Sequence, residues 1–113
     1  MDFQKTELPE LTERELERRK HSLTNISYWK NQQQEEVDFI VKEGKVKQLI
    51  QVCSDISDAD VKKRELRALL KASKELRCSN LLVVTESYEA EELVKGKKIS
   101  FVPLWKWLLV EAQ

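Results

Sequence analysis

The stretch EEVDFIVKEGKVKQLIQVCSD, residues 35–55, predicts two β-strands joined by a tight turn at Glu43-Gly44. Side chains alternate between the two faces of a strand, so each strand is expected to divide into two sets. The first strand should carry Glu36, Asp38, Ile40 and Lys42 on one face and Val37, Phe39 and Val41 on the other. The second should carry Lys47, Leu49, Gln51 and Cys53 opposite Val46, Gln48, Ile50 and Val52. A carboxylate is costly to bury unpaired, so Asp38 on this hydrophobic strand is expected to have a partner or a function.

The segments around this hairpin predict an α/β fold. Helices are expected over residues 8–21, 61–77 and 104–112, and further strands over 26–30, 81–85 and 97–102. Residues 57–60 offer N-caps for the second helix, and residues 88–94 are expected to form a short helix or a turn. The continuous apolar run at 81–85 is typical of a strand covered on both faces. We therefore expect a mixed β-sheet flanked by helices, in one domain with an N-terminal helical segment (1–24) and a core (25–113).

Composition excludes several classes of protein. Apolar residues make up 41% of the 113 and charged residues 35%, and no run of 18 apolar residues exists, so no membrane span is expected. The N-terminus lacks the apolar core of a signal peptide, which favours a cytoplasmic location with Cys53 and Cys78 as reduced, buried thiols. With one histidine, His21, and no Cys-x-x-Cys pair, neither a zinc site nor a cysteine nucleophile is indicated. No phosphate-binding glycine loop is present, so no ATP binding is expected.

The charge is unevenly distributed although the chain is formally neutral. Residues 61–80 carry seven basic and two acidic groups, and Lys63, Arg67, Lys71 and Lys74 recur at helical intervals and should project together. This face of the helix is the best candidate for weak nucleic-acid binding. The same pattern also fits the solvated side of any amphipathic helix, and no aromatic residues interleave it for base stacking.

The last predicted helix contains Trp105 and Trp107 among Leu104, Leu108, Leu109 and Val110. A helix that is apolar nearly all round is buried on more than one side, either in the core or against a partner. Tryptophan is a common anchor at interfaces. We expect core packing with part of the surface open to a protein partner or to a second copy of the chain.

Several pieces, taken in order, resemble the core of the PD-(D/E)xK nuclease fold. The resemblance is closest to the nuclease-like domain at the C-terminus of a group of archaeal AAA+ ATPases. The matching pieces are Tyr28-Trp29-Lys30, Glu36-Val37-Asp38-Phe39, Gln51-Val52-Cys53, the basic helix from Lys62 to Leu76, and Pro103 to Leu109. They cover residues 26–110, and the ATPase part is missing. The resemblance implies a restriction-endonuclease-like core in which Asp38, Gln51 and Cys53 line one pocket.

The chain departs from that family at the residues that matter for catalysis. In the family an Asp and a Glu hold the metal ion and a Lys supplies positive charge. Asp38 keeps the first position, but Gln51 stands where the Glu is expected and Cys53 where the Lys is expected. A neutral, soft thiol cannot replace an ammonium group beside a phosphate. The family also has an acid on its first helix, and the spacing here does not single out one of Glu10, Glu13, Glu15 and Glu17.

These departures leave two functions open. The first is a non-catalytic, nuclease-like interaction domain, accessory to an archaeal ATPase, that contacts DNA or a protein partner and needs no cofactor. The second is a divergent Mg²⁺-dependent DNA endonuclease, in which Asp38 and Glu36, with Gln51, bind the metal ion and Lys42, Lys47 or Lys71 is a displaced cation. A dimerisation unit that uses the tryptophan helix is a third possibility.

Overall fold

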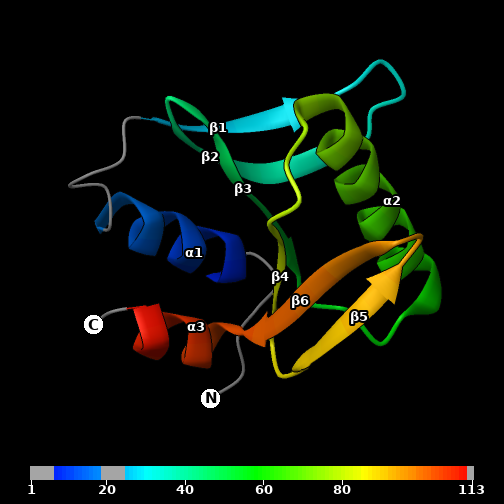
Figure 1. The fold of residues 1–113 in the computed structure, drawn as a ribbon. Coiled ribbons are helices and arrows are strands. Elements are labelled where there is room, and N and C mark those ends of the chain that lie inside the picture. The colour runs from blue at the N-terminus through cyan, green and yellow to red at the C-terminus, as the bar shows by residue number, and fades with distance from the viewer. Residues whose placement is uncertain (1–6, 19–24, 112–113) are drawn as a thin grey trace.

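The computed structural model describes residues 7–18 and 25–111, which form three helices and one six-stranded sheet (Figure 1). In chain order the elements are α1 (Glu7–Arg18), β1 (Asn25–Lys30), β2 (Glu36–Glu43), β3 (Lys45–Cys53), α2 (Ala59–Leu76), β4 (Leu81–Thr85), β5 (Ala90–Val94), β6 (Lys97–Pro103) and α3 (Leu104–Glu111). The strand order is β1-β2-β3-β4-β6-β5, in which β3, β4 and β6 are parallel and the other pairs antiparallel. The predicted mixed sheet flanked by helices is confirmed.

The helices cover both faces of the sheet: α2 packs on one, and α1 and α3 on the other (Figure 1). On the α2 side, Leu66, Leu69 and Ala72 pack in one apolar cluster with sheet residues such as Leu49 and Val83. On the opposite side, α1 and α3 contribute Leu8, Leu16, Leu104 and Trp107 to a second cluster. All five residues of β4 are buried, as expected for a strand covered on both faces.

Helix α2 begins and ends close to the predicted limits because both ends are capped. The Asp58 side chain accepts hydrogen bonds from the backbone N–H groups of Asp60 and Val61 at 3.0 and 3.2 Å. At the other end Arg77 takes a left-handed conformation, with φ of 53°, that closes the helix. The predicted first helix extends over residues 19–21, which, with His21, lie outside the described residues.

The expectation of a short helix or turn at residues 88–94 is wrong, because Ala90–Val94 forms the edge strand β5. Lys95 and Gly96 both have positive φ, 50° and 80°, and make the two-residue turn that pairs Val94 with Lys97. The glutamates at 91 and 92 favoured a helix locally, and the hairpin overrides that preference. Lys62 of α2 lies 2.8 Å from the Glu92 carboxylate, which ties this edge strand to the helix.

Irregular pairing changes the predicted alternation of the central hairpin. Trp29 pairs with Val37 and Ser27 with Ile40, so β2 holds one extra residue between those pairs. As a result Val37 joins Ile40 in the cluster under α2, and its predicted place beside Phe39 and Val41 is wrong. A second irregularity in β3 places Val46 against the same cluster, opposite to the prediction.

Two expectations from composition concern burial and membranes. Cys53 and Cys78 are both buried and unbridged, as predicted. Over the described ranges 7–18 and 25–111, no helix has the length and apolar content needed to cross a bilayer.

Candidate functional site

Asp38 and Gln51 lie where β2 and β3 stop pairing with each other. The last backbone pair between these strands joins Phe39 and Ile50. Beyond it, the Asp38 Oδ2 atom accepts a hydrogen bond from the backbone N–H of Val52 at 2.8 Å. In return, Gln51 Oε1 accepts a hydrogen bond from the backbone N–H of Asp38 at 2.9 Å. We call this reciprocal pair of side chains the Asp38–Gln51 clasp.

The Gln51 amide group also makes two hydrogen bonds through its nitrogen. Gln51 Nε2 donates to the backbone carbonyl of Glu36 at 2.9 Å and to that of Glu65 in α2 at 3.2 Å. The side chain is fully buried, so these bonds satisfy polar atoms that water cannot reach. Gln51 therefore joins both strands and the helix, a role that needs a donor as well as an acceptor.

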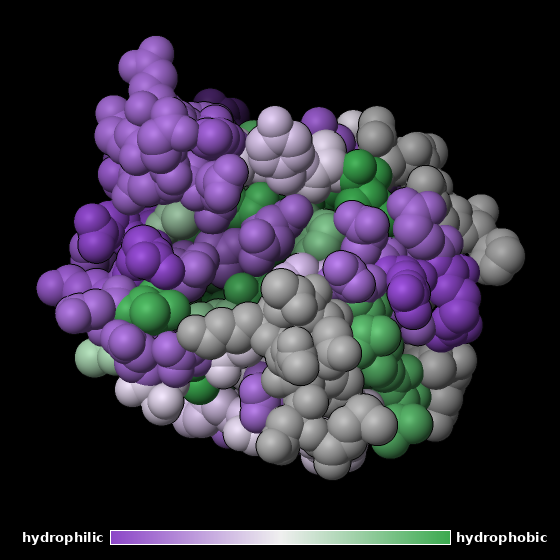
Figure 2. All heavy atoms as spheres, turned by 180° about the vertical axis from the view of Figure 1, so that it is seen from behind, coloured by the Kyte–Doolittle hydropathy of each residue, from purple (hydrophilic) through white to green (hydrophobic). Residues whose placement is uncertain are grey.

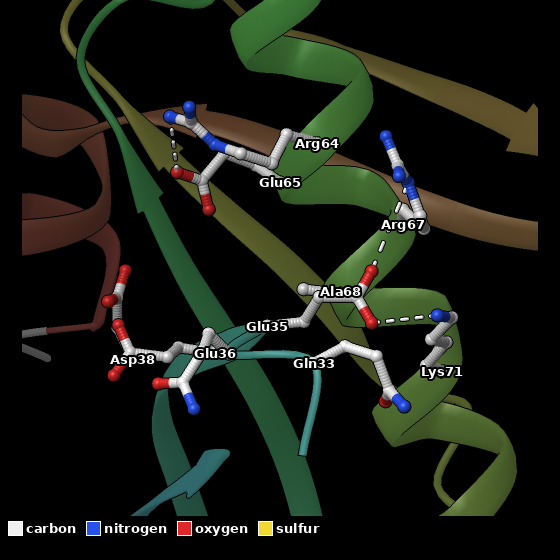
Figure 3. Close-up of a pocket in the computed structure, with 10 residues that line it drawn as sticks. Gln33, Glu35, Glu36, Asp38, Arg64, Glu65, Arg67, Ala68 and Lys71 are labelled. Carbon is white, nitrogen blue, oxygen red and sulfur yellow. Dashed lines mark hydrogen bonds and ion pairs between the residues drawn. The ribbon is translucent and has the colours of Figure 1, made fainter. Parts of the chain in front are cut away.

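An open pocket of about 580 Å³ lies beside the clasp, between the segment before β2 and helix α2 (Figure 3). The lining residues are Gln33, Gln34, Glu35, Glu36, Asp38, Arg64, Glu65, Arg67, Ala68 and Lys71. Across the pocket, Arg67 and Lys71 of α2 pair with Glu35, the residue before β2. Of the residues expected to form a catalytic site, Asp38 and Glu36 line this pocket, whereas Gln51 is buried beneath it.

Glu65 is a member of this site that the sequence did not reveal. Burial raises the pKa of both Asp38 and Glu65, and the charge of Asp38 raises the pKa of Glu65 further. The hydrogen bond from Val52 opposes the shift at Asp38, and the Arg64 guanidinium, 3.7 Å away, opposes it at Glu65. The sequence feature that could have pointed to Glu65 is its position next to Leu66, at the border of the apolar face of α2.

Glu35, at the other end of the pocket, is held by two hydrogen-bond donors and a more distant cation. Lys71 Nζ lies 2.7 Å and Arg67 Nε 4.0 Å from its carboxylate (Figure 3). Asn31 Nδ2 donates a hydrogen bond to it at 2.9 Å. These donors lower the pKa of Glu35, with the Asn31 hydrogen bond making the largest contribution. Lys63, Arg67, Lys71 and Lys74 are all exposed on α2, but two of the four are thus engaged by one carboxylate.

Cys53 faces the same side of the sheet but does not share the pocket of Asp38. It is 3% exposed and lines a separate cavity of about 190 Å³ with Asp55, Arg64 and Glu65 among others. Burial, together with the nearby Glu65 carboxylate, raises the pKa of the thiol to about 11, so Cys53 is protonated at neutral pH. The expectation that Asp38, Gln51 and Cys53 line one pocket is therefore wrong.

The described residues offer few side-chain ligands for a Mg²⁺ site of the kind that the resemblance implies. Mg²⁺ takes six oxygen ligands at close to octahedral geometry, of which the protein commonly supplies one or two carboxylates and water or substrate the rest. Within residues 7–18 and 25–111, no three side chains of His, Cys, Asp or Glu converge closely enough to hold a metal ion. Gln51 Oε1 and Asp38 Oδ2 already accept backbone hydrogen bonds. None of Glu10, Glu13, Glu15 and Glu17 on α1 lines the pocket.

The two tryptophans of α3 have different environments. Trp107 is 4% exposed and packs with Leu104 in the cluster under α1 and α3, so it is not available to a partner. Trp105 is 56% exposed, and Leu109, one turn later on the same face of the helix, is 64% exposed. In Figure 2 hydrophobic atoms gather on the α3 side, at the lower right, whereas hydrophilic atoms dominate the α2 side, at the left.

Comparison with known proteins places the chain in a family. The model of a family described as "Domain of unknown function (DUF4143)" matches residues 13–107. "Uncharacterized protein MJ1544" of the archaeon Methanocaldococcus jannaschii is 38% identical over 91 residues, which are 75% of this chain and 20% of the relative. The chain thus spans about a fifth of the length of this curated relative. With more than half of its length matched, the chain belongs to the DUF4143 family.

Proposed function

We propose that this chain is a non-catalytic, nuclease-like interaction domain that is accessory to an archaeal ATPase. The observation that carries the proposal is the Asp38–Gln51 clasp. In it, one oxygen atom of each side chain accepts a hydrogen bond from a backbone N–H group of the sheet. A hydrolytic metal site draws its ligands from such oxygens, and here one oxygen of each side chain is already directed at a backbone N–H group. The mixed sheet with flanking helices is compatible with a restriction-endonuclease-like core.

Cys53, at the position where the resembled family has a lysine, also supports a non-catalytic role. The Cys53 thiol is neutral at physiological pH and lies outside the pocket lined by Asp38. It offers no positive charge to stabilise a phosphorane-like transition state.

Two surfaces are suited to interaction. Trp105 and Leu109 offer an exposed apolar face on α3 for a protein partner, with the aromatic anchor that interfaces favour. Lys63, Arg67, Lys71 and Lys74 offer a basic face on α2 for weak DNA contact. The relative from Methanocaldococcus jannaschii is about five times as long as the matched segment, which supports a role as one domain of a larger assembly. The ATPase itself rests on the resemblance of the sequence motifs.

A cleavage assay tests the proposal. Purified protein is incubated with supercoiled plasmid and with single-stranded DNA in Mg²⁺ and in Mn²⁺, and we expect no cleavage above a buffer control. The variants Asp38→Ala and Asp38→Asn are assayed in parallel. Asparagine keeps an oxygen that can accept the Val52 hydrogen bond but carries no charge for a metal ion. Cleavage by the wild type that is lost in a folded Asp38→Asn variant would overturn the proposal.

A divergent Mg²⁺-dependent endonuclease is the second candidate, and one observation favours it. Asp38 and Glu65 bring two carboxyl groups with raised pKa values to neighbouring positions, and perturbed carboxyl groups in a cleft are common at functional sites. Calorimetric titration with Mg²⁺ separates the candidates. Heat of binding that is present in the wild type and absent in Glu65→Gln favours the endonuclease, and no heat in either supports the interaction domain.

A further inference from the structure

The carboxylate of Glu35 lies in a cradle of donors built by two other parts of the chain. Lys71 and Arg67 reach it from α2, and Asn31 reaches it from the loop after β1. Figure 3 shows the Glu35 side chain directed at the helix, with its oxygens between these two cations. The Glu35 side chain is 13% exposed, whereas those of Arg67 and Lys71 are 53% and 48% exposed. The anion is therefore covered while the donors still face solvent.

We infer that Arg67, Lys71 and Asn31 form a phosphate subsite for nucleic acid, and that Glu35 occupies it as an internal counter-anion until a backbone phosphate displaces it. The inference rests on the DNA-contacting part of the proposed function. It adds which residues bind the backbone and why the free protein binds it weakly. A carboxylate and a phosphate group present similar oxygens to an arginine–lysine–amide donor set, so one can exchange for the other.

The exchange is feasible because the ion pairs of Glu35 are solvent-accessible on the cationic side. Arg67 and Lys71 are about half exposed, so water and salt partly screen their attraction to Glu35 and ease a change of partner. The pocket in front of the cradle is open, and Gln33, Gln34 and Arg64 line it beside the cradle. An incoming phosphate finds the amide groups of Gln33 and Gln34 there, whereas Arg64 already pairs with Glu65. The carboxylates of Glu36 and Asp38 also line the pocket, so the phosphate is expected at the Lys71 and Arg67 end.

The cradle is part of a row, and this favours a polyanion over a single free phosphate. Lys63 and Lys74 flank Arg67 and Lys71 on the same helix, and both are exposed. At a rise of about 1.5 Å per residue, successive members of the row lie about 6, 6 and 4.5 Å apart along the axis. Nucleic-acid backbones present repeated negative charges, and each phosphate neutralised releases counterions and adds affinity.

The decisive variant is Glu35→Gln, which keeps an oxygen for Asn31 and removes the charge that holds Arg67 and Lys71. Binding to a fluorescein-labelled 20-base-pair duplex is followed by anisotropy at several salt concentrations. We expect the variant to bind about three- to tenfold tighter than the wild type, with a salt dependence steeper by about two counterions. The control is Glu43→Gln, which removes the same charge from the exposed β2–β3 turn and should give a smaller gain with an unchanged slope.

The outcomes separate this inference from the proposed function. If both glutamine variants bind equally more tightly with equal slopes, net charge alone acts and the subsite is overturned, while DNA contact stands. If no variant binds duplex, the subsite is overturned and the protein-docking surface on α3 is unaffected. Since a glutamine at 35 could disturb the loop, a second measurement uses the wild type. Its Asn31 side-chain amide resonances should shift on titration with the duplex, and unchanged resonances would also overturn the subsite.

Discussion

The side chains of Asp38 and Gln51 each hydrogen-bond to the backbone of the strand that carries the other. Asp38 Oδ2 accepts from Val52 in β3, and Gln51 accepts from Asp38 and donates to Glu36 in β2. Where the two strands diverge, these side chains give partners to backbone groups that the sheet ladder no longer pairs. A buried backbone group without a partner is destabilising, so the clasp stabilises the end of the hairpin next to the pocket.

The first prediction concerns Gln51→Glu, the substitution that would restore the acid expected in a nuclease. A carboxylate can accept from the Asp38 N–H but cannot donate to the carbonyls of Glu36 and Glu65. It would also place a charge at a fully buried position near Asp38. We expect the free energy of unfolding, measured by urea denaturation at pH 7, to fall by about 2–4 kcal/mol.

The matched control is Gln48→Glu, on the same strand at a half-buried position with one long hydrogen bond, 3.4 Å to Asn80. This change should cost no more than about 0.5 kcal/mol. The reading of Gln51 as a structural residue is contradicted if the two variants are equally stable. It is also contradicted if Mg²⁺ raises the melting temperature of Gln51→Glu by several degrees while leaving the wild type unchanged.

The second prediction concerns pH and the Glu65 carboxyl group. Its pKa is raised in the folded state above its ordinary value of 4.5. In the pH interval between these two values the folded chain holds more protons than the unfolded chain, so this group makes stability fall as pH rises. The stability that this group contributes is lost completely once the pH exceeds the raised pKa. Glu65→Gln lacks this group, and its stability relative to the wild type should therefore increase from pH 4 towards neutrality.

Urea denaturation of both proteins at half-unit steps from pH 4 to 8 measures this difference directly. Glu35 and Glu92 have lowered pKa values and lose their contributions only below pH 4.5. Asp38, whose pKa is also raised, is present in both proteins, so the difference between them reports Glu65 and its coupling to Asp38. A difference in unfolding free energy that stays constant across the whole range would show that Glu65 is not desolvated in the folded protein.

The sequence predicted the regular elements well because local signals were strong. Three segments show patterns that each favour one type of secondary structure: the apolar run at 81–85, the capped helix 61–77 and the turn at Gly44. The edge strand β5 was missed because Ala90-Glu91-Glu92-Leu93 favours a helix locally, and only pairing with β6 makes it a strand. The alternation at Val37 and Val46 failed because strand irregularities depend on the partner strand.

The candidate site was less predictable than the fold. The sequence indicated Asp38, Glu36 and Gln51 correctly as neighbours, since a hairpin fixes which positions oppose one another. It could not show that Gln51 would hydrogen-bond to backbone groups, because the divergence of β2 and β3 is a tertiary feature. Glu65 and Glu35 lie on different parts of the chain, and their spacing in the sequence does not indicate that both line the same pocket.

The third prediction concerns the reactivity of Cys53. A thiol that is 3% exposed, with a pKa raised to about 11, presents almost no thiolate to attack a disulfide reagent at pH 7. We expect an aromatic disulfide reagent to modify this cysteine only as fast as the protein unfolds. The slow phase should contain two thiols in the wild type, because Cys78 is also buried, and one in Cys53→Ala. A phase complete within seconds at pH 7 that vanishes in Cys53→Ala would refute this assignment.

The fourth prediction contrasts the two tryptophans of α3. Truncating Trp107 to alanine removes a core side chain from the cluster that joins α1, α3 and the sheet, and should cost about 3–5 kcal/mol of unfolding free energy. Trp105 is more than half exposed, so Trp105→Ala should cost less than about 1 kcal/mol. Urea denaturation measures both values, and acrylamide quenching of Trp107→Phe and Trp105→Phe reports the exposure of the remaining α3 tryptophan.

The same helix tests whether its exposed face serves a second copy of the chain. Trp105→Glu places a charge at the centre of the face shared with Leu109, which would disrupt any apolar contact there without disturbing the core. Light scattering on the wild type and on this variant then separates two uses of the surface. A mass that falls only in Trp105→Glu assigns the face to a homodimer. A monomer mass in both proteins would indicate that the exposed face binds a different protein or another domain. That result would agree with the match to a fifth of the archaeal relative's length.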